Sequence, residues 1–438
     1  MRALAVLVAV ALAAACSAPA PRVAAPAPTR APTTAPATTR PPPSTTTPAP
    51  PPPCPAPPAV ATERPPPGLV AAVAAGLADG RFGTAAVSAS VWVEGFGEVG
   101  AREPGLALAP ASNQKLLTAA GVLAALPAGH RMATEVRVAG DDLVLVAGGD
   151  PTLTTGSLAA LAAQVAAAGV AAVPGRLVVD ETRYEAARAA PGWQGWQQPA
   201  YVGPLSALTV DDNRHRTDAA FVADPATGNG ELFRAALAGA GVTVAGPTVV
   251  AAAPAGGRVV ASLRSPPLAD LVATMVRESD NEVAEALTRE AGVLLAGEGS
   301  TAAGVTALAG VLRDELCLDL AGGWADGSGL SRSDARSAAD LVAVVGAARG
   351  RPWWPAFRGA LAVAGRTGTL AERFVGTAAE GNLRAKTGTI IGGVALTGEV
   401  TTAGGRLATF SVVVNGDGAA AAQQAIDDLL VAVAVDAS

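Results

Sequence analysis

The chain has 438 residues, more than one small domain needs, which predicts two or three folding units. Half of the residues are apolar and can form a large core, and the formal net charge of −6 argues against a nucleic-acid partner, because no basic stripe is available to displace phosphate counterions. The two histidines, His130 and His215, lie outside any metal-binding motif, so we expect ordinary histidines rather than a zinc site.

The N-terminus has the pattern of a secretory signal. Met1 and Arg2 are followed by an uninterrupted apolar run that ends at Cys16. This run is well short of the roughly 20 residues that a helix needs to cross a bilayer. We therefore expect residues 1–16 to be a signal peptide of a protein exported to the cell envelope. Residues 13–16 resemble a bacterial lipobox that lacks its usual large aliphatic residue, so a lipid anchor at Cys16 and simple cleavage at an Ala-x-Ala site both stay open.

Residues 17–67 are rich in Pro, Ala and Thr, with no acidic residue before Glu63. Such a segment buries too little apolar surface to fold, and its prolines favour an extended conformation of about 3.1 Å per residue. We expect a disordered stalk that holds the folded region away from a membrane, with an inert linker as the alternative. Cys54 near its end and Cys317 in the folded part are candidates for a disulfide that would pin the stalk to the folded region.

The folded region is expected to begin near residue 68. Apolar spacing predicts a helix over residues 68–78, and alternation predicts a strand over residues 86–94. A further Ala- and Leu-rich helix from residue 116 puts Ser112 at or near its N-terminus. Three strand-like runs and a final helix follow at the other end, over residues 383–389, 394–400, 407–415 and 419–435. This arrangement predicts a mostly antiparallel sheet flanked by the terminal helices.

The first motif, Ser112-Asn113-Gln114-Lys115, has the spacing of a serine nucleophile with a lysine base. Three positions apart on a helix, the hydroxyl and the amine lie on one face and within reach of each other. A buried lysine, whose pKa is lowered by desolvation and nearby positive charge, can take the proton of the serine. Free N–H groups at a helix N-terminus can also stabilise an oxyanion. By itself the motif is weak, because a helix cap beside a solvated lysine has the same spacing.

The second motif, Ser279-Asp280-Asn281, connects two helix-like segments, residues 268–278 and 282–291. On such a connection the Ser279 hydroxyl can relay a proton to a leaving group, and the Asn281 amide can bind a substrate amide. A plain turn with a helix cap is the alternative interpretation.

The third motif, Lys386-Thr387-Gly388-Thr389, lies in a strand pattern that points Lys386 and Gly388 to one face. Lys386 would supply positive potential, and the hydroxyls of Thr387 and Thr389 would bind a substrate carboxylate. Gly388 would let a ligand approach the backbone closely. An edge strand carrying an ordinary lysine is the alternative.

In this order the three motifs resemble those of penicillin-binding proteins of the D-alanyl-D-alanine carboxypeptidase type, specifically the PBP4-like (DacB) group, peptidase family S13. Further strings extend the resemblance from about residue 68 to the C-terminus: Ala147-Gly148-Gly149-Asp150-Pro151-Thr152-Leu153, Ser206-Ala207-Leu208 with Asn213, Asp326-Gly327-Ser328-Gly329-Leu330-Ser331-Arg332, and Gly368-Thr369-Leu370 ahead of Arg373. The resemblance implies an α/β (α+β) fold of the serine β-lactamase and penicillin-binding transpeptidase type, with an antiparallel sheet flanked by helices and an all-helical subdomain.

The first two motifs are separated by 279 − 112 = 167 positions, much more than in a compact β-lactamase. We expect a β-rich inserted domain over residues 132–262, between two parts of the catalytic domain, residues 68–131 and 263–438. Strand-like and helix-like runs lie within the insert, over residues 134–138, 143–146, 176–180 and 243–250 for strands and 158–168 for a helix. We expect Trp193 and Trp196 to be packed core or lid aromatics, with surface recognition groups as the alternative.

The resemblance implies a serine-type D-Ala-D-Ala carboxypeptidase that acts on peptidoglycan stem peptides and is acylated by β-lactams, which mimic the terminal dipeptide. Ser112, deprotonated by Lys115, would form the acyl-enzyme, and Ser279 and Lys386 would pass a proton to the departing D-alanine. No metal or organic cofactor is implied.

The same resemblance places the oxyanion between the backbone N–H groups of Ser112 and Thr389. The substrate carboxylate would rest on Thr387 and Thr389, beside Gly388, and Asn281 would hold the peptide amide. Two other functions stay open, a β-lactamase or serine esterase of the same fold and a non-catalytic cell-wall-binding protein. Carboxypeptidase and endopeptidase activities use the same groups, so the sequence does not separate them.

Overall fold

The computed structural model describes residues 61–213 and 222–436, which belong to one compact unit, Pro51–Ser438. The predicted signal peptide, the predicted stalk up to residue 60, and Cys16, Cys54 and His215 lie outside the described residues. Within the described ranges, no helix combines the length and the apolar character that a membrane span requires.

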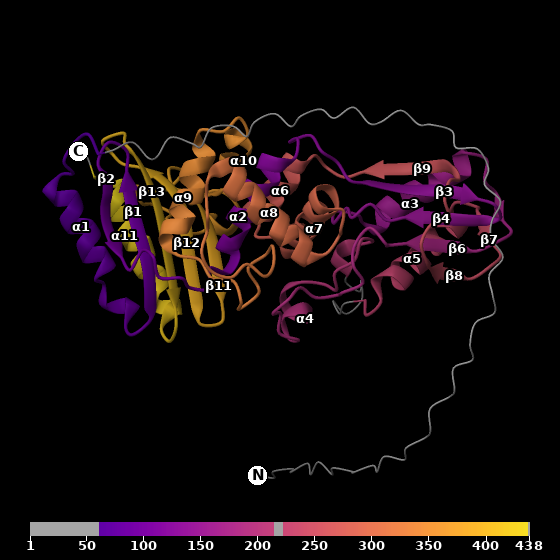
Figure 1. The fold of residues 1–438 in the computed structure, drawn as a ribbon, viewed down its shortest axis with the longest axis horizontal. Coiled ribbons are helices and arrows are strands. Elements are labelled where there is room, and N and C mark those ends of the chain that lie inside the picture. The colour runs from indigo at the N-terminus through magenta and orange to yellow at the C-terminus, as the bar shows by residue number, and fades with distance from the viewer. Residues whose placement is uncertain (1–60, 214–221, 437–438) are drawn as a thin grey trace, which may run out of the picture. The chain divides into compact units, whose positions relative to one another are not determined.

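A six-stranded sheet combines strands from the two ends of the folded region (Figure 1). Its members, in spatial order, are β10 (Ala362–Val363), β11 (Arg384–Ile390), β12 (Gly393–Thr401), β13 (Leu407–Asn415), β1 (Ala86–Val93) and β2 (Gly97–Arg102). Every neighbouring pair is antiparallel, and Ser90 of β1 lies opposite Ser411 of β13. The predicted antiparallel sheet is confirmed, with the unpredicted strands β2 and β10 at its edges.

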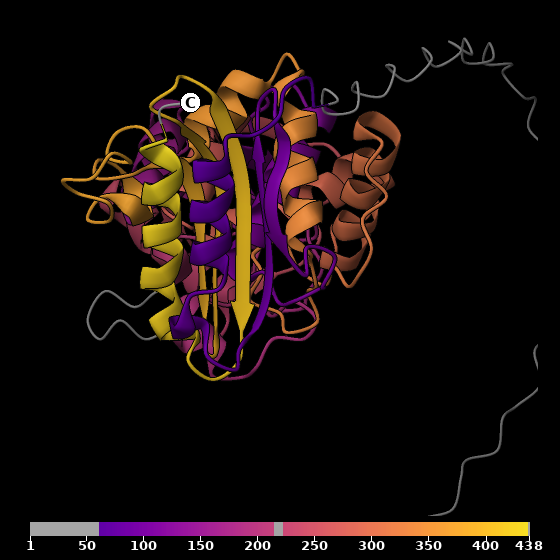
Figure 2. The same cartoon turned by 90° about the vertical axis from the view of Figure 1, so that its left-hand side faces the viewer.

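The two terminal helices, α1 (Pro67–Leu77) and α11 (Ala419–Ala434), lie side by side on one face of this sheet (Figure 2). Val73 of α1 and Leu430 of α11 are fully buried in the same apolar core as the strand residues of that face. The helices cross closely at Gly76, where a Cβ atom would lie 2.7 Å from Leu429 Cδ1. Burial of these apolar side chains is what attaches both termini of the folded region to the sheet.

The opposite face of the sheet is covered by a helical region around α2 (Gln114–Ala125). The other helices of this region are α6 (Leu268–Arg277), α7 (Asn281–Ala291), α8 (Thr301–Leu316), α9 (Ala338–Arg349) and α10 (Trp354–Ala360). Helix α2 is buried from Gln114 to Leu123, as expected for a helix that is surrounded on all sides. The predicted all-helical subdomain therefore exists, and it surrounds the helix that follows Ser112.

The region between the first two motifs forms a second sheet of order β8-β6-β4-β3-β9. Its strands are β3 (Ala133–Ala139), β4 (Asp142–Val146), β6 (Leu177–Asp180), β8 (Thr248–Val250) and β9 (Arg258–Arg264), and its helices are α3 (Thr155–Ala167) and α5 (Pro225–Gly239). Strands β4, β6 and β8 are parallel, while β3 is antiparallel to both of its neighbours. Neither α5 nor β9 was predicted.

The single strand predicted over residues 243–250 is wrong. The structure divides it into β7 (Thr243–Val244), which pairs with β5 (Ala172–Val173), and β8 in the larger sheet. The extended segment is interrupted at Gly246 and Pro247, between the two strands. Gly246 approaches Gly175 so closely that a Cβ atom would lie 2.6 Å from the Gly175 oxygen, and proline offers no N–H for a strand ladder.

Candidate active site

Ser112 lies in a short 3-10 turn, Ala111–Asn113, that leads into α2, rather than in the first α-helical turn itself. Ala111, immediately before it, has φ of 49°, in the left-handed region that non-glycine residues rarely adopt. Gly329 packs against this turn, because a Cβ atom there would lie 1.9 Å from the Ala111 oxygen. Strained backbone persists where its surroundings fix it. The turn Ala111–Asn113, called the nucleophile turn because it carries the predicted nucleophile Ser112, is therefore held rigidly.

Lys115 is fully buried and directed at Ser112. Its Nζ atom donates to Ser112 Oγ at 3.1 Å, to Asn281 Oδ1 at 2.6 Å and to the Ser328 carbonyl at 2.7 Å. These three acceptors match the three donors of an ammonium group. The structure thus brings the predicted nucleophile, the predicted base and the predicted amide of the second motif together around one nitrogen atom.

Burial lowers the pKa of Lys115 to about 8, although the nearby carboxylates of Asp326 and Glu285 oppose this shift. A lysine with this pKa is partly neutral close to physiological pH. In the neutral form its lone pair can accept the Ser112 proton, which a permanently charged lysine cannot do.

Lys386 of β11 is also fully buried, and its Nζ donates to the Thr387 carbonyl at 2.8 Å. Burial, and then the charge of Lys115, lower its pKa well below the usual range. A depressed pKa suits a group that exchanges protons. It also weakens the positive potential that was expected of Lys386.

Ser279 lies between α6 and α7 with φ of 64° and is partly buried. Asp280 caps α7 by accepting from the backbone N–H of Val283 at 2.9 Å, so the second motif is a helix cap as well as part of the site. Asn281 begins the helix, and its Nδ2 donates to the Tyr201 carbonyl at 3.0 Å. Both polar atoms of the Asn281 side chain therefore have protein partners.

Gly388 is the point where β11 meets the nucleophile turn. A Cβ atom there would lie 2.7 Å from Asn113 Nδ2 and 2.8 Å from the Pro110 oxygen. The absence of a side chain at Gly388 therefore lets the nucleophile turn pack against the backbone of β11. Thr387 Oγ1 donates to Thr369 Oγ1 at 2.7 Å, and the Thr389 side chain is exposed.

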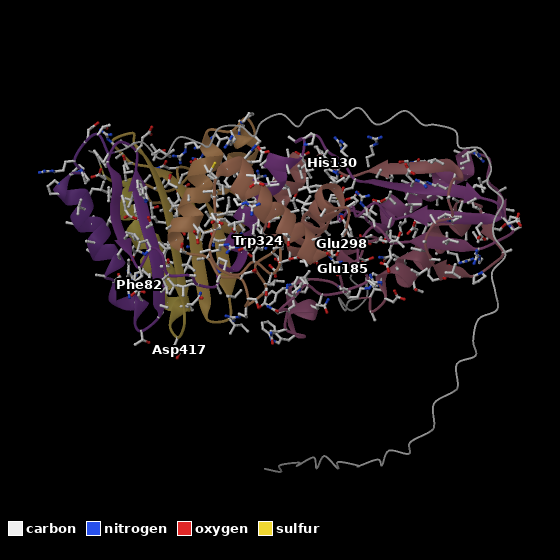
Figure 3. The ribbon with its side chains drawn as sticks, viewed as in Figure 1. Phe82, His130, Glu185, Glu298, Trp324 and Asp417 are labelled. Carbon is white, nitrogen blue, oxygen red and sulfur yellow. The ribbon has the colours of Figure 1, made fainter. Side chains whose placement is uncertain are left out.

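The inserted region reaches the site through its residues 193–203. Trp193 Nε1 donates to Asp326 Oδ2 at 2.7 Å, and Gln197 Nε2 donates to the Leu330 carbonyl at 2.8 Å. Trp324, labelled in Figure 3, supports the same loop by donating to the Asp326 carbonyl at 2.9 Å. The insert is thus bonded directly to the loop that carries Ser328.

The two tryptophans of the insert differ. Trp193 is partly buried beside Leu330, as expected for a packed aromatic. Trp196, by contrast, is 44% exposed, so it is not a packed core residue. It lies edge-to-face with Tyr201 of α4 (Gln197–Tyr201), with ring centroids 6.0 Å apart. The short, polar α4 lies at the surface and offers no core for this ring.

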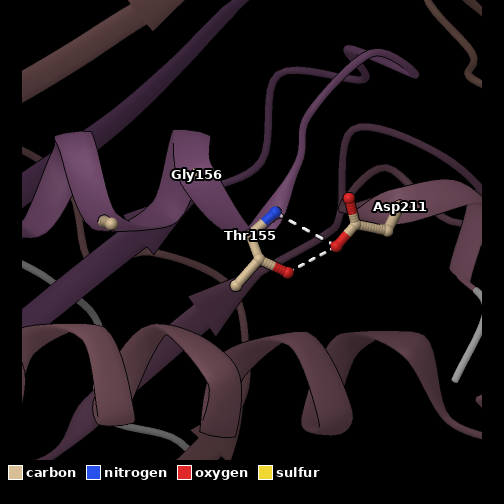
Figure 4. A pocket seen from close by; sticks show the side chains of 4 residues that line it. Thr155, Gly156 and Asp211 are labelled. Carbon is tan, nitrogen blue, oxygen red and sulfur yellow. Dashed lines mark hydrogen bonds between the residues drawn. The ribbon is translucent and has the colours of Figure 1, made fainter. Parts of the chain in front are cut away.

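A cavity of about 640 Å³ lies away from these residues, in the inserted region, and is lined by Thr155, Gly156, Ala159 and Asp211 (Figure 4). Asp211 Oδ2 accepts from the Thr155 hydroxyl and, at 3.1 Å, from its backbone N–H. Both bonds hold the start of α3, so this carboxylate has a structural partner.

Two partners of the site were not predicted as such, the carbonyl groups of Ser328 and Tyr201. Backbone groups carry no residue-type signal, although Ser328 lies within one of the strings that extended the family resemblance. Thr369, the partner of Thr387, lies within another.

Comparisons with known proteins agree with this geometry. The model of the D-Ala-D-Ala carboxypeptidase 3 (S13) family matches residues 69–220 and 215–435. A D-alanyl-D-alanine carboxypeptidase of Actinomadura sp. (strain R39) is 34% identical over 407 residues, which cover 73% of this chain and 75% of that protein. Carboxypeptidase DacB of Mycolicibacterium smegmatis is 34% identical over 385 residues, or 80% of each chain.

Solved structures show the same fold. Penicillin-binding protein 4 (dacB) of Haemophilus influenzae, also solved in complex with a β-lactam, matches with a TM-score of 0.68 and 21% identity over 79% of this chain and 93% of that one. The predicted α+β fold of the penicillin-binding type is therefore confirmed. With its family model covering most of the described residues and relatives at 34% identity, the chain belongs to the D-Ala-D-Ala carboxypeptidase (S13) family.

Proposed function

We propose that the protein is a serine-type D-Ala-D-Ala carboxypeptidase that acts on peptidoglycan stem peptides through an acyl-enzyme on Ser112. The observation that carries this proposal is the buried Nζ of Lys115, 3.1 Å from Ser112 Oγ and 2.6 Å from Asn281 Oδ1, in a chain of the S13 family. Relatives named D-alanyl-D-alanine carboxypeptidase and carboxypeptidase DacB support it.

Acylation begins when neutral Lys115 takes the proton of Ser112. The Oγ atom then bonds to the carbonyl carbon of the penultimate D-alanine, and the carbonyl π electrons move to its oxygen. Backbone N–H groups of Ser112 and Thr389 would stabilise this oxyanion. The strained turn at Ala111 holds Ser112 for this attack, so little of the binding energy is spent on positioning it.

The intermediate collapses when the C–N bond breaks and the terminal D-alanine leaves. Its amine needs a proton, which Ser279 and Lys386 would relay from the protonated base. Water then attacks the ester carbonyl and gives its proton to the base. The bond between the acyl carbon and Ser112 Oγ breaks, Oγ takes the proton from the base, and the shortened peptide leaves as a carboxylic acid. The depressed pKa of Lys386 suits such a relay.

Substrate recognition would use the exposed end of β11. Thr387 and Thr389 would bind the terminal carboxylate, and Asn281 would hold the peptide amide after exchanging one of its present partners. Because an anion beside Lys386 favours the ammonium form, binding would raise the pKa of this lysine and prime it as a proton donor.

The test is to incubate the full-length protein with a pentapeptide muropeptide and to measure the D-alanine released. Release that stops in Ser112→Ala and after penicillin treatment is the expected result. Penicillin turnover faster than D-alanine release would replace the proposal by a β-lactamase, and wall binding without release would favour a non-catalytic protein. A cross-linked muropeptide in parallel separates carboxypeptidase from endopeptidase activity.

The domain organisation is also a proposal, with a catalytic domain of residues 68–131 and 263–438 and an inserted domain of residues 132–262. The separate sheet of order β8-β6-β4-β3-β9, whose strands all lie between residues 133 and 264, supports the inserted domain. A peptidoglycan substrate supports action outside the cytoplasm, in the cell envelope, and a signal peptide over residues 1–16 would direct the export.

Attachment to the envelope would be through lipid at Cys16, which metabolic labelling with a lipid precursor tests. A disulfide between Cys54 and Cys317 would join the stalk to the folded region, and the disulfide-bonded state of Cys317 supports it. Mass spectrometry of the non-reduced protein distinguishes this bridge from free thiols.

A further inference from the structure

Helix α7 carries a buried carboxylate, Glu285, one turn after Asn281. The side chain is fully buried, and its Oε1 accepts from the backbone N–H groups of Gly327 at 3.1 Å and Ser328 at 2.9 Å. Its Oε2 has no hydrogen-bond partner among residues 61–213 and 222–436. A buried carboxylate with one unpartnered oxygen costs stability. The two N–H groups that Glu285 binds therefore indicate its role.

Glu285 holds the peptide segment that touches Lys115. The N–H of Ser328 donates to Glu285, and the carbonyl of the same residue accepts from Lys115 Nζ at 2.7 Å. The carbonyl of Gly327 accepts from Thr118 Oγ1, on the helix that carries Lys115, at 2.8 Å. Glu285 is therefore connected to the general base through one residue.

The segment has little freedom on either side. At Gly327 a Cβ atom would lie 2.0 Å from Thr288 Oγ1 of α7, and at Gly329 it would lie 1.9 Å from the Ala111 oxygen of the nucleophile turn. Asp326 holds the far end by accepting from the N–H groups of Gly329 at 2.6 Å and Ser331 at 2.8 Å. A change at Glu285 is thus transmitted to the carbonyl of Ser328 rather than absorbed by a flexible loop.

Several charged groups face Lys115 from the elements around it. The carboxylates are those of Asp326 on the loop, Glu285 and Glu282 on α7, and Asp280 before it, and the ammonium of Lys386 lies on β11. Burial, and then the charge of Asp326, raise the pKa of Glu285. The same two causes raise the pKa of Asp334 well above its usual range. Where Glu285 is ionised, its charge favours the ammonium form of Lys115.

We propose that Glu285 is a positioning residue for the general base, which fixes the Ser328 carbonyl that orients Lys115 toward Ser112. This inference rests on the proposed function, because it assigns Lys115 as the base. Glu285 does not touch substrate and acts through the loop.

The test compares three variants of the full-length protein in β-lactam acylation and in D-alanine release, each measured from pH 6 to pH 10. Glu285→Met has similar volume but no strong acceptor, and we expect an acylation rate about 100-fold lower with KM nearly unchanged, as for a misplaced catalytic group. Glu285→Asp keeps the charge but is too short to hold both N–H groups, and a smaller loss is expected.

Glu285→Gln keeps one acceptor oxygen for the two N–H groups, and most of the activity should be retained. Because the raised pKa of Glu285 leaves it largely protonated over the acid limb, that limb should change little in Glu285→Gln. A matched control is Glu290→Met, on the same helix and equally buried, whose carboxylate bonds Arg183 and His130 rather than the loop. It should lower the melting temperature without lowering the acylation rate of the folded protein.

Wild-type acylation rates in both folded Glu285→Met and Glu285→Asp would overturn the proposal. If Glu285→Met does not fold, an unchanged acylation rate in Glu285→Asp, which is too short to hold both N–H groups, has the same consequence. Failure of the proposed function itself is distinguishable, because then the wild-type protein would release no D-alanine and would not be acylated.

Discussion

Asn281 donates through Nδ2 to the backbone carbonyl of Tyr201 at 3.0 Å. One residue belongs to the second motif and the other to the inserted region, so the insert is a direct partner of the site. The connection continues at Glu282, whose Oε1 accepts from the Gly203 N–H at 2.6 Å.

Ser112→Ala should abolish covalent labelling by a fluorescent penicillin and leave the fold intact. The Ser112 side chain is partly buried and accepts one hydrogen bond, so its loss changes the melting temperature little. Gel fluorescence measures the labelling, and circular dichroism controls for folding. Persistent labelling of this variant would refute Ser112 as the nucleophile.

The rate of β-lactam acylation should rise with pH through about 8, because the base must be neutral and burial lowers the pKa of Lys115 to about 8. Stopped-flow measurements of the second-order acylation constant from pH 6 to pH 10 test this limb. Lys115→Ala should lose about 1,000-fold in rate, within the range for removal of a general base. A flat profile in the wild-type protein would contradict the assignment.

The free energy of unfolding of Glu282→Gln, relative to that of the wild type, should increase as the pH rises. Burial raises the pKa of Glu282 to about 7 from its usual 4.5, so the folded protein binds more protons than the unfolded chain between these values. Wild-type stability from this group is therefore lost as pH rises through that window, by at most about 1.4 kcal/mol per pH unit. Urea unfolding at pH 5 and pH 8 measures the difference, and equal pH dependence in the two proteins would count against it.

Gly388→Ala should impair both stability and acylation. The new methyl group would lie 2.8 Å from the Pro110 oxygen, a backbone atom of the nucleophile turn, and overpacking of this kind typically costs about 1–3 kcal/mol. Thermal unfolding and penicillin labelling measure the two effects. Gly346→Ala is the control, because Gly346 is exposed in α9 with nothing within 4 Å of a Cβ atom, and alanine there should stabilise the helix.

Much of the fold could be predicted because strong local patterns coincide with the tertiary structure. The strands β11, β12 and β13 are separated by glycine-containing turns, and the helices α1 and α11 have long apolar runs, so the structure has all five within a few residues of the prediction. The predicted strand over residues 243–250 failed because two short strands of similar composition meet at a glycine and a proline. Helix α5 was missed, since its sequence contains three internal or terminal glycines and little apolar periodicity.

For the site, residue types and order were enough to bring Ser112, Lys115 and Asn281 together. The path to Glu285 was not visible, because it runs through backbone groups of Gly327 and Ser328. Nor was the 3-10 turn at Ser112, whose geometry depends on the packing of Gly329 against Ala111. What the sequence does not reveal is mainly contact between segments that are distant along the chain.

The pairing of β1 with β13, with Ala86 opposite Asn415, has a consequence for how the protein matures. Strand β1 is synthesised long before β13, its partner near the other end of the chain, and such distant pairings form slowly. Until that partner arrives, the helices around Ser112 have no sheet to pack against. We therefore expect the ability to react with a β-lactam to appear only after β13 has been synthesised, and a chain shortened before β13 to be inert.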